Sequence, residues 1–296
     1  MQKALNRFLL LQPAWLPPVL FIPLLYALGW LTAVPLMLFG LPAAQLSLTG
    51  TVLSFVLFLL LMPQWATLRW SAERPWVALG ICRTNQQEQS APAAALLKGL
   101  LTAAALLTVI TSIVLIGGSG EWRGEVDGTH LANAVLLCLG VGLAEELIFR
   151  SWLWAELNRM MGSRRGALAQ AIIFSLVHTR FNLGLAAMSG LHIGLFLLGM
   201  VLAIQRQADQ GSLWGCIGLH GGLVAGWFLL QSSLIQLSPK APLWLVGPGG
   251  SAANPLAGAV GLISLLILLL IQRTAVAKAA LPATGARNAS LREDTP

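Results

Sequence analysis

Long apolar stretches separated by short polar ones make up most of this 296-residue chain. About 20 consecutive apolar residues are enough for a helix to cross the hydrocarbon core of a bilayer. Stretches of about that length fall at residues 15–39, 46–64, 93–117, 131–156, 166–184, 185–204, 212–231 and 255–272. The pattern therefore predicts an all-α polytopic membrane protein, a bundle of about eight transmembrane helices.

The first apolar stretch follows Lys3 and Arg7, an arrangement that superficially resembles a secretory signal peptide. Its apolar part continues from about Phe8 to Phe39, whereas a signal peptide has an apolar region of about 7–15 residues. We therefore expect this stretch to be retained as the first membrane helix. It also contains prolines that predict a kink, at Pro17, Pro18, Pro23 and Pro35.

Composition excludes an ordinary soluble protein. Hydrophobic residues make up 56% of the chain and charged residues only 10%, whereas soluble domains carry about 25% charged residues. The net charge of +7 does not indicate a nucleic-acid partner, because the basic residues gather in the loops of one side. With eight spans and the N-terminus inside, 14 of the 18 Lys and Arg residues lie on the inner side and 3 on the outer side. By the positive-inside rule, both termini are expected in the cytoplasm.

We expect one integral membrane domain over residues 1–296. Its last residues, 279–296, are polar and rich in small residues, and we expect them to form a disordered tail. The ionisable side chains that lie well inside the spans all fall in residues 131–231, which we take as the catalytic core. The cysteines, Cys82, Cys138 and Cys216, lack the spacing of a disulfide framework or a thiolate metal site. No cofactor and no metal is therefore expected.

Two glutamates and an arginine interrupt the fourth apolar stretch, in the sequence AEELIFR at residues 144–150. Ionisable groups at membrane depth are costly and usually functional. Glu146 and Arg150 are four residues apart, so they share a helical face and are predicted to pair. Glu145 points about 100° away from that face, towards Phe149 and Trp152, and has no cation at helical spacing. We therefore interpret Glu145 as a candidate base and the pair as a brace.

Three histidines lie in the later apolar stretches, His178, His192 and His220. With a rise of about 1.5 Å per residue, Glu145, His178 and His220 lie roughly 16, 18 and 12 Å from the inner end of their helices. A carboxylate and two imidazoles at one level are expected to share a small intramembrane polar cavity. An isolated histidine in a membrane helix is more often a packing residue, so each ring alone is a weak signal.

Taken in order, these residues resemble a known family. Glu145-Glu146-x-x-x-Arg150, then Phe174-x-x-x-His178 and a later helical His220 are similar to the motifs of the CPBP intramembrane glutamic endopeptidases. The family is also called the Abi or type II CAAX prenyl protease family. The resemblance covers about residues 131–231 and is closest to bacterial members.

The resemblance implies an eight-helix bundle whose polar cavity opens towards the cytoplasm. It implies that Glu145 activates water together with His178, and that His220 stabilises the oxyanion without a metal. The family often continues its third motif as HxxxN, but this chain has Val224 at that position. Asn182, four residues after His178, is the candidate replacement donor.

His192 matches no family motif and is kept as a supporting residue. We expect a peptide or protein substrate, the lipid bilayer as surroundings and no nucleic acid. The membrane is either a bacterial plasma membrane or an internal membrane. Two other functions fit the residues: a proton-coupled transporter, because a glutamate near histidines suits a proton relay, and a non-catalytic scaffold or immunity protein. The oligomeric state does not follow from the sequence.

Overall fold

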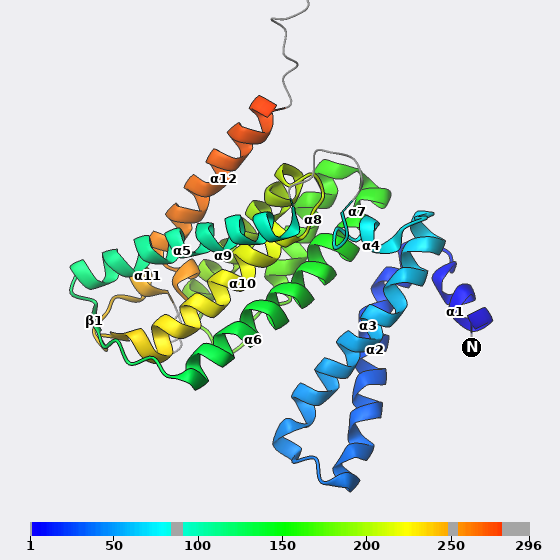
Figure 1. Cartoon of the computed structure of the whole chain (residues 1–296), viewed down its shortest axis with the longest axis horizontal. Coiled ribbons are helices and arrows are strands. Elements are labelled where there is room, and N and C mark those ends of the chain that lie inside the picture. The colour runs from blue at the N-terminus through cyan, green and yellow to red at the C-terminus, as the bar shows by residue number, and fades with distance from the viewer. Residues whose placement is uncertain (1, 84–90, 248–253, 280–296) are drawn as a thin grey trace, which may run out of the picture.

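The structure, a computed structural model, describes residues 2–83, 91–247 and 254–279. Every apolar stretch of the sequence has its own main helix in these ranges (Figure 1). The main helices are α2 (Leu16–Ala33), α3 (Leu46–Trp70), α5 (Pro92–Ile116), α6 (Gly128–Glu145), α8 (Ser163–Leu176), α9 (Leu185–Ala208), α10 (Trp214–Leu229) and α12 (Ala259–Ala279). The prediction of an all-α polytopic membrane protein is confirmed.

Six helical segments of the described residues are long and apolar enough to cross a membrane. The two main helices outside this set are α8 with 14 residues and α10 with 16 residues. Both are shorter than the stretches expected for them, because α8 ends at Leu176, just before the turn that carries His178, and α10 passes into a π-helix at Leu230. Of the tail expected to be disordered, 280–296 lies outside the described residues.

Shorter elements connect or extend these helices. They are α1 (Gln2–Leu9), η1 (Val34–Phe39), η2 (Ala43–Gln45), α4 (Pro75–Ala78), β1 (Gly120–Trp122), η3 (Glu146–Leu153), α7 (Trp154–Met161), η4 (Leu230–Leu234), β2 (Ile235–Leu237), α11 (Leu243–Val246) and η6 (Pro255–Ala257). The strands β1 and β2 pair antiparallel, with Glu121 opposite Gln236. This small sheet ties the end of α5 to the end of α10.

The helix that carries the AEELIFR sequence changes its winding at the two glutamates. It begins as α6, where the Asp127 side chain caps the helix by accepting a hydrogen bond from the backbone N–H of His130 (2.8 Å). From Glu146 to Leu153 it is a π-helix, η3, and it then continues as α7 to Met161. π-Helical segments are rare and are frequently found at functional sites.

Helix α10 lies close to both α5 and α6 because glycines line the contacts. A Cβ atom on Gly218 would lie 2.2 Å from the Leu96 carbonyl oxygen of α5. A Cβ atom on Gly221 would lie 2.2 Å from the Cys138 carbonyl oxygen of α6. Small residues allow membrane helices to approach this closely. The approach of α6 and α10 brings Glu145 and Glu146 near His220.

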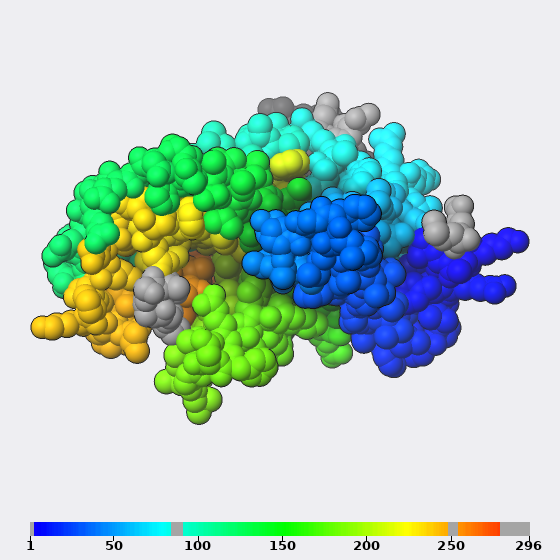
Figure 2. All heavy atoms as spheres, turned by 90° about the horizontal axis from the view of Figure 1, so that it is seen from below, coloured from blue at the N-terminus to red at the C-terminus, as the bar shows by residue number. Residues whose placement is uncertain are grey.

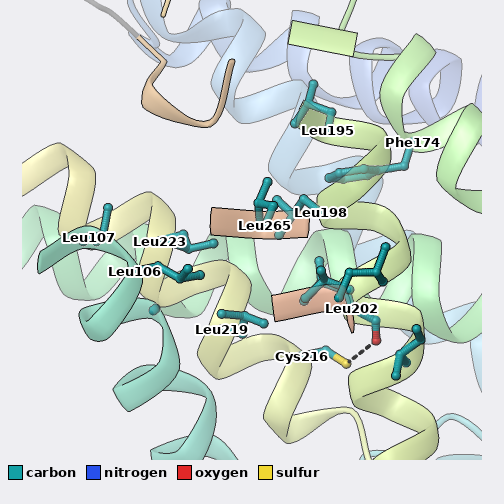
Figure 3. Packing of buried hydrophobic residues seen from close by; sticks show 14 of the residues in the cluster. Leu106, Leu107, Phe174, Leu195, Leu198, Leu202, Cys216, Leu219, Leu223 and Leu265 are labelled. Carbon is teal, nitrogen blue, oxygen red and sulfur yellow. Dashed lines mark hydrogen bonds between the residues drawn. The ribbon is translucent and has the colours of Figure 1, made fainter. Parts of the chain in front are cut away.

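On its other side, α10 packs into a leucine-rich core shared with α5, α9 and α12 (Figure 3). Leu219 and Leu223 of α10 meet Leu198 and Leu202 of α9, with Leu265 of α12 in the same cluster. All five side chains are buried. The cluster holds α10 against α9, and it fixes the side of the candidate site that is remote from α6.

The N-terminal helices form a hairpin, α2 and α3, that leans away from the rest of the bundle at its far end (Figure 1). At its near end an aromatic cluster joins the hairpin to η3. Trp152 of η3 lies 5.5 Å from the rings of both Phe21 and Trp65, and 6.2 Å from the ring of Phe58. The aromatic cluster therefore attaches the α2–α3 hairpin to η3, the segment that carries the motif.

Candidate active site

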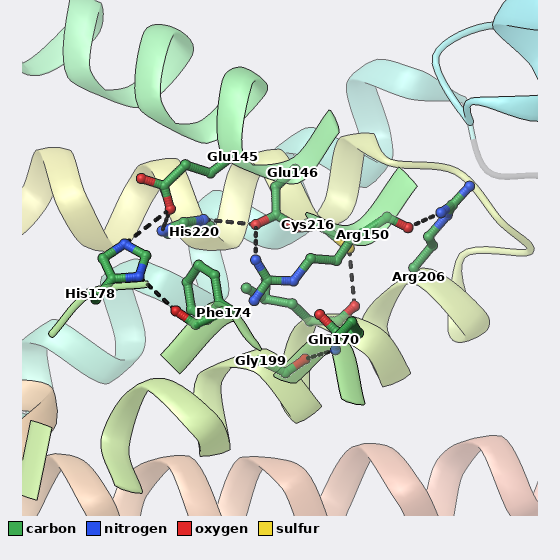
Figure 4. A network of polar contacts seen from close by, with 11 residues as sticks. Glu145, Glu146, Arg150, Gln170, Phe174, His178, Gly199, Arg206, Cys216 and His220 are labelled. Carbon is green, nitrogen blue, oxygen red and sulfur yellow. Dashed lines mark hydrogen bonds and ion pairs between the residues drawn. The ribbon is translucent and has the colours of Figure 1, made fainter. Parts of the chain in front are cut away.

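Three elements bring Glu145 together with two imidazoles (Figure 4). Glu145 is the last residue of α6, His178 lies in the turn after α8, and His220 is on α10. Glu145 Oε2 lies 3.6 Å from His178 Nε2 and 3.7 Å from His220 Nε2. The Glu145 and His178 side chains are 27% and 33% exposed, whereas that of His220 is 6% exposed. The three groups expected at one depth therefore converge around Glu145 Oε2. This oxygen is itself buried, whereas the Glu145 and His178 side chains as a whole are partly exposed.

The neighbouring Glu146 faces the interior. Its Oε1 accepts a hydrogen bond from Arg150 (3.0 Å), as the spacing predicts, and a second from His220 Nδ1 (2.7 Å). The Glu146 and Arg150 side chains are fully buried. Glu146 is thus more than the partner of Arg150, because it also fixes the orientation of the His220 ring.

Phe174 lies at the centre of this polar group. The Arg150 guanidinium is stacked over the Phe174 ring at 3.9 Å, a cation–π contact. The same ring meets His178 at 4.8 Å and His220 at 5.7 Å, both edge to face. The phenylalanine of the FxxxH motif therefore fixes the relative positions of the arginine and both histidines.

The two aromatic residues expected beside Glu145 lie in different places. Phe149 packs edge to face on Phe174, with ring centroids 5.1 Å apart. Trp152 belongs to the aromatic cluster with Phe21, Phe58 and Trp65. The π-helical winding of η3 changes the angle between successive residues, so a face drawn for an α-helix does not hold across this segment.

The fifth apolar stretch was expected to be helical to residue 184, but α8 ends at Leu176. The His178 side chain replaces part of the missing helix, because its Nδ1–H donates to the Phe174 carbonyl (2.7 Å). The Thr179 hydroxyl donates to the Leu176 carbonyl (2.6 Å). Side chains therefore satisfy the last carbonyl groups of α8, and His178 projects from a turn rather than from the middle of a helix.

His192 of α9 lies behind that turn. Its Nδ1 is 3.0 Å from the Ser175 hydroxyl and 3.1 Å from the Ser175 carbonyl oxygen, and its Nε2 is 3.5 Å from the Thr179 hydroxyl. The Ser175 hydroxyl also donates to the His192 carbonyl (2.8 Å). These contacts attach α9 to the segment that carries His178, and they give His192 a supporting place at the site.

The two positions considered for a second oxyanion donor add none here. Asn182 lies exposed on the turn before α9, and among the described residues it makes no hydrogen bond to the site. Val224 lies one helical turn after His220 on α10, and its side chain carries no polar atom. Neither position therefore supplies the second donor that the resemblance led us to expect.

Arg206 is a residue that the motifs do not reveal. It lies in the last turn of α9, is part-buried, and donates to the backbone carbonyls of Arg150 and Gly211. A π-helix does not pair its carbonyls as an α-helix does, and Arg206 binds one carbonyl of η3. The only sequence signal was a cation at the end of an apolar helix, which is equally typical of an inner loop.

The hydrogen bonds determine where the imidazole protons lie. A carbonyl or a carboxylate can only accept, so His178 and His220 carry their protons on Nδ1, towards Phe174 and Glu146. In the neutral rings, both Nε2 lone pairs therefore face Glu145 Oε2. A water molecule has two hydrogens, so two of these three acceptors can bind one water molecule, or two of them can share one proton.

We also searched the described residues for side chains that could bind a metal ion. Within the part of the chain that the structure describes, no group of three or more His, Cys, Asp and Glu side chains is arranged to hold a metal ion. The acidic and imidazole groups of the site are instead connected to Arg150, Phe174 and each other. The arrangement is suited to moving a proton between oxygen and nitrogen atoms.

Comparisons with known proteins divide the chain. Residues 127–226 match the family model for type II CAAX prenyl endopeptidase Rce1-like proteins, and residues 2–74 match a domain of unknown function, DUF8676. No curated protein and no solved structure matches the chain. The first match encloses every residue of the site and confirms the resemblance drawn from the motifs. The chain is thus a multi-pass membrane protein, and its residues 127–226 form an Rce1-like domain of the type II CAAX prenyl endopeptidase family, which is a family of proteases.

Proposed function

We propose that the chain is an intramembrane endopeptidase in which Glu145 activates a water molecule to hydrolyse a peptide bond. The observation that carries the proposal is the position of Glu145 Oε2, 3.6 Å and 3.7 Å from the two imidazole Nε2 atoms. A water molecule hydrogen-bonded to Glu145 Oε2 and His178 Nε2 has its two hydrogens directed at those two atoms. Its oxygen lone pair is then free to attack a carbonyl carbon.

The steps follow from the proton positions. Water oxygen bonds to the carbonyl carbon while Glu145, assisted by His178, takes a proton. The carbonyl oxygen becomes an oxyanion. The C–N bond then breaks, and the proton held by Glu145 and His178 passes to the leaving amine. One water is consumed, and an acid and an amine are released.

In this proposal His220 stabilises the oxyanion. Its Nδ1–H donates to the buried carboxylate of Glu146 at 2.7 Å, which fixes the direction of the ring, and its Nε2 faces the reaction point. In the proposed step, Nε2 of His220 also carries a proton and donates a hydrogen bond to the oxyanion. Preorganised donors of this kind are usually the largest single contribution to catalysis of acyl transfer.

Access for a substrate is consistent with the proposal. Glu145 and His178 are both partly exposed, while Glu146 and Arg150 behind them are not. Figure 2 shows the surface hollowed between α6, the yellow-green segment after α8 and the α2–α3 hairpin. A peptide held in the membrane can therefore approach the open side of the site. A CAAX-type substrate, as in the name of the matching family, is the substrate class that we propose.

The test is cleavage of a membrane-anchored reporter peptide by the purified chain. Glu145→Gln keeps the size of the side chain but removes the base, so we expect cleavage to fall about 10²–10⁴-fold. His220→Ala is expected to cost about 10²–10³-fold, the loss seen when one oxyanion donor is removed. Prenylated and unprenylated C-terminal peptides should be compared side by side to define the substrate.

Glu121→Gln is the matched control, because Glu121 is an exposed acid of the β1 strand, remote from the site. Its cleavage rate should stay near that of the original chain, and so should the thermal unfolding of Glu121→Gln and Glu145→Gln. Cleavage retained in Glu145→Gln would contradict the proposed base. A chelator such as 1,10-phenanthroline should leave the rate unchanged, and strong inhibition would contradict direct activation of water by Glu145.

A further inference from the structure

A pocket of about 590 Å³ lies away from the candidate active site, between the N-terminal region and α7. Its walls come from the segment after α1, the last turns of α3 and the last turns of α7. Leu10, Leu11 and Trp15 are exposed apolar side chains of this lining. The size falls in the usual range of small-molecule sites, about 300–1,000 Å³. Both regions that match a family model contribute to it.

In one wall of the pocket, the charges of Glu156 and Arg69 balance each other. Glu156, only 1% exposed, receives hydrogen bonds from the indole N–H groups of Trp65 and Trp70 and from Arg69, whose Nη2 lies 2.7 Å from Oε2. Arg69 also donates to the carbonyls of Leu9 and Ala14. The charge of Arg69 is thus balanced by Glu156, and most of its donors are in use.

The charge of Arg159 is not balanced in this way. The Arg159 guanidinium stacks over the Trp70 ring at 5.0 Å and donates once, from Nη1 to the Ala155 carbonyl (3.0 Å). No carboxylate of the described residues lies within ion-pair distance of it. Nε and Nη2 of Arg159 therefore keep their N–H groups for a ligand. A cation with directed donors beside apolar walls is suited to an anion that carries an apolar body.

We propose that this pocket binds the headgroup of an anionic phospholipid. The pocket lies at the ends of α3 and α7, and two segments able to span a membrane end there, at Trp70 and Met161. The end of a span is where a membrane helix leaves the hydrocarbon and meets the headgroups. The phosphate is held by Arg159, and the upper acyl carbons lie along Leu10, Leu11 and Trp15. Basic pockets between membrane helices are known to bind anionic headgroups. The lipid then bridges residues 2–74 and the Rce1-like domain, a role independent of peptide cleavage.

The test measures lipid binding by the purified, delipidated full-length chain, with native mass spectrometry as the readout. Phosphatidylglycerol and phosphatidylcholine with identical acyl chains are titrated in parallel. We expect the original chain to bind phosphatidylglycerol about tenfold more tightly, since one charge-assisted contact has about that effect. Arg159→Gln should remove this preference, because it weakens phosphatidylglycerol, a net anion, more than phosphatidylcholine, whose phosphate is balanced by its own choline.

Arg165→Gln is the matched control, because Arg165 is an exposed arginine at the start of α8 and does not line the pocket. It should leave the preference intact. Gln12→Glu serves as a second variant if Arg159→Gln folds poorly. Gln12 lines the pocket and is exposed, so a carboxylate there should weaken phosphatidylglycerol binding by charge repulsion alone.

Three results would overturn the proposal. The first is equal binding of the two lipids by the original chain. The second is an equal loss in Arg159→Gln and Arg165→Gln, which would indicate a general effect of surface charge. The third is displacement of the lipid by inorganic phosphate at similar concentrations, which would indicate a site for a free anion.

Discussion

Two adjacent glutamates of one helix have opposite environments in this protein. Glu145 is partly exposed and faces two imidazoles, whereas Glu146 is fully buried and binds Arg150 and His220. The pairing of Glu146 with Arg150 was predictable, because residues four apart meet on a helix. The His220 contact was not, since it joins residues 74 positions apart. The sequence therefore distinguished the two acids, and the fold gave each of them its partners.

A prediction at this scale concerns the buried pair. Arg150→Met keeps an unbranched side chain of similar length over Phe174 but leaves the Glu146 carboxylate without its cation. Removing one partner of a buried ion pair typically costs about 3–5 kcal/mol. We therefore expect thermal unfolding at a clearly lower temperature, measured in the same detergent or lipid.

Arg164→Met is the control for the loss of a surface arginine. Arg164 is exposed in the first turn of α8, so its removal should change stability by about 0.5 kcal/mol or less. Equal stability of the Arg150 and Arg164 variants would contradict a structural role for the Glu146–Arg150 pair.

At the scale of elements, the site depends on how closely α6 and α10 approach. Gly221 of α10 faces the Cys138 carbonyl of α6, where a Cβ atom would be 2.2 Å from the oxygen. The glycines of α10 are visible in the sequence, but which helix each one faces is decided by packing. The end of α8 and the π-helix at Glu146–Leu153 were likewise not predicted. Both replace regular α-helical hydrogen bonds by contacts with side chains, from His178 and Arg206.

Gly221→Ala tests this approach. The added methyl group forces α6 and α10 apart, and overpacking of this kind typically costs about 1–3 kcal/mol. We expect lower thermal stability and also slower peptide cleavage, because the Glu146–His220 bond crosses the same contact. Both are measured on one purified sample.

Gly140→Ala on α6 provides the matched control. A Cβ atom at Gly140 meets nothing within 4 Å, so the substitution should leave cleavage unchanged. Its stability should be equal or higher, by up to about 1 kcal/mol, because alanine favours the helix over glycine. A Gly221 variant that behaves like the Gly140 variant would show that the helices are not in close contact there.

For the whole molecule, the important contact joins residues 2–74 to the Rce1-like domain. Glu156 of α7 binds Trp65, Arg69 and Trp70 of α3, so one buried carboxylate connects the two regions. Next to it lie the aromatic cluster around Trp152 and the pocket lined by Arg159. The N-terminal region is therefore attached to the same helix that carries Glu145 and Glu146.

Glu156→Gln tests that attachment. An amide cannot balance the charge of Arg69 or accept on both of its polar atoms, so we expect destabilisation of about 3 kcal/mol or more. Relative to the original chain, hydrogen exchange measured by mass spectrometry should become faster in α1 and α2 and change less in α10. Glu73→Gln, an exposed acid in the loop after α3, should change neither. Uniformly faster exchange along the chain would contradict a local attachment at Glu156.

The sequence by itself determined the class of the protein and singled out the residues of the candidate site. Apolar length and the spacing of Glu146 and Arg150 are local properties, and their consequences can be computed along one helix. Only the tertiary structure decided which groups meet: His220 with Glu146, His178 with Glu145, and Arg206 with the carbonyl of Arg150. Those contacts depend on how far apart the packed helices lie and how each is rotated. Small side chains and the positions of the helix ends set both. No pattern within a single helix contains that information.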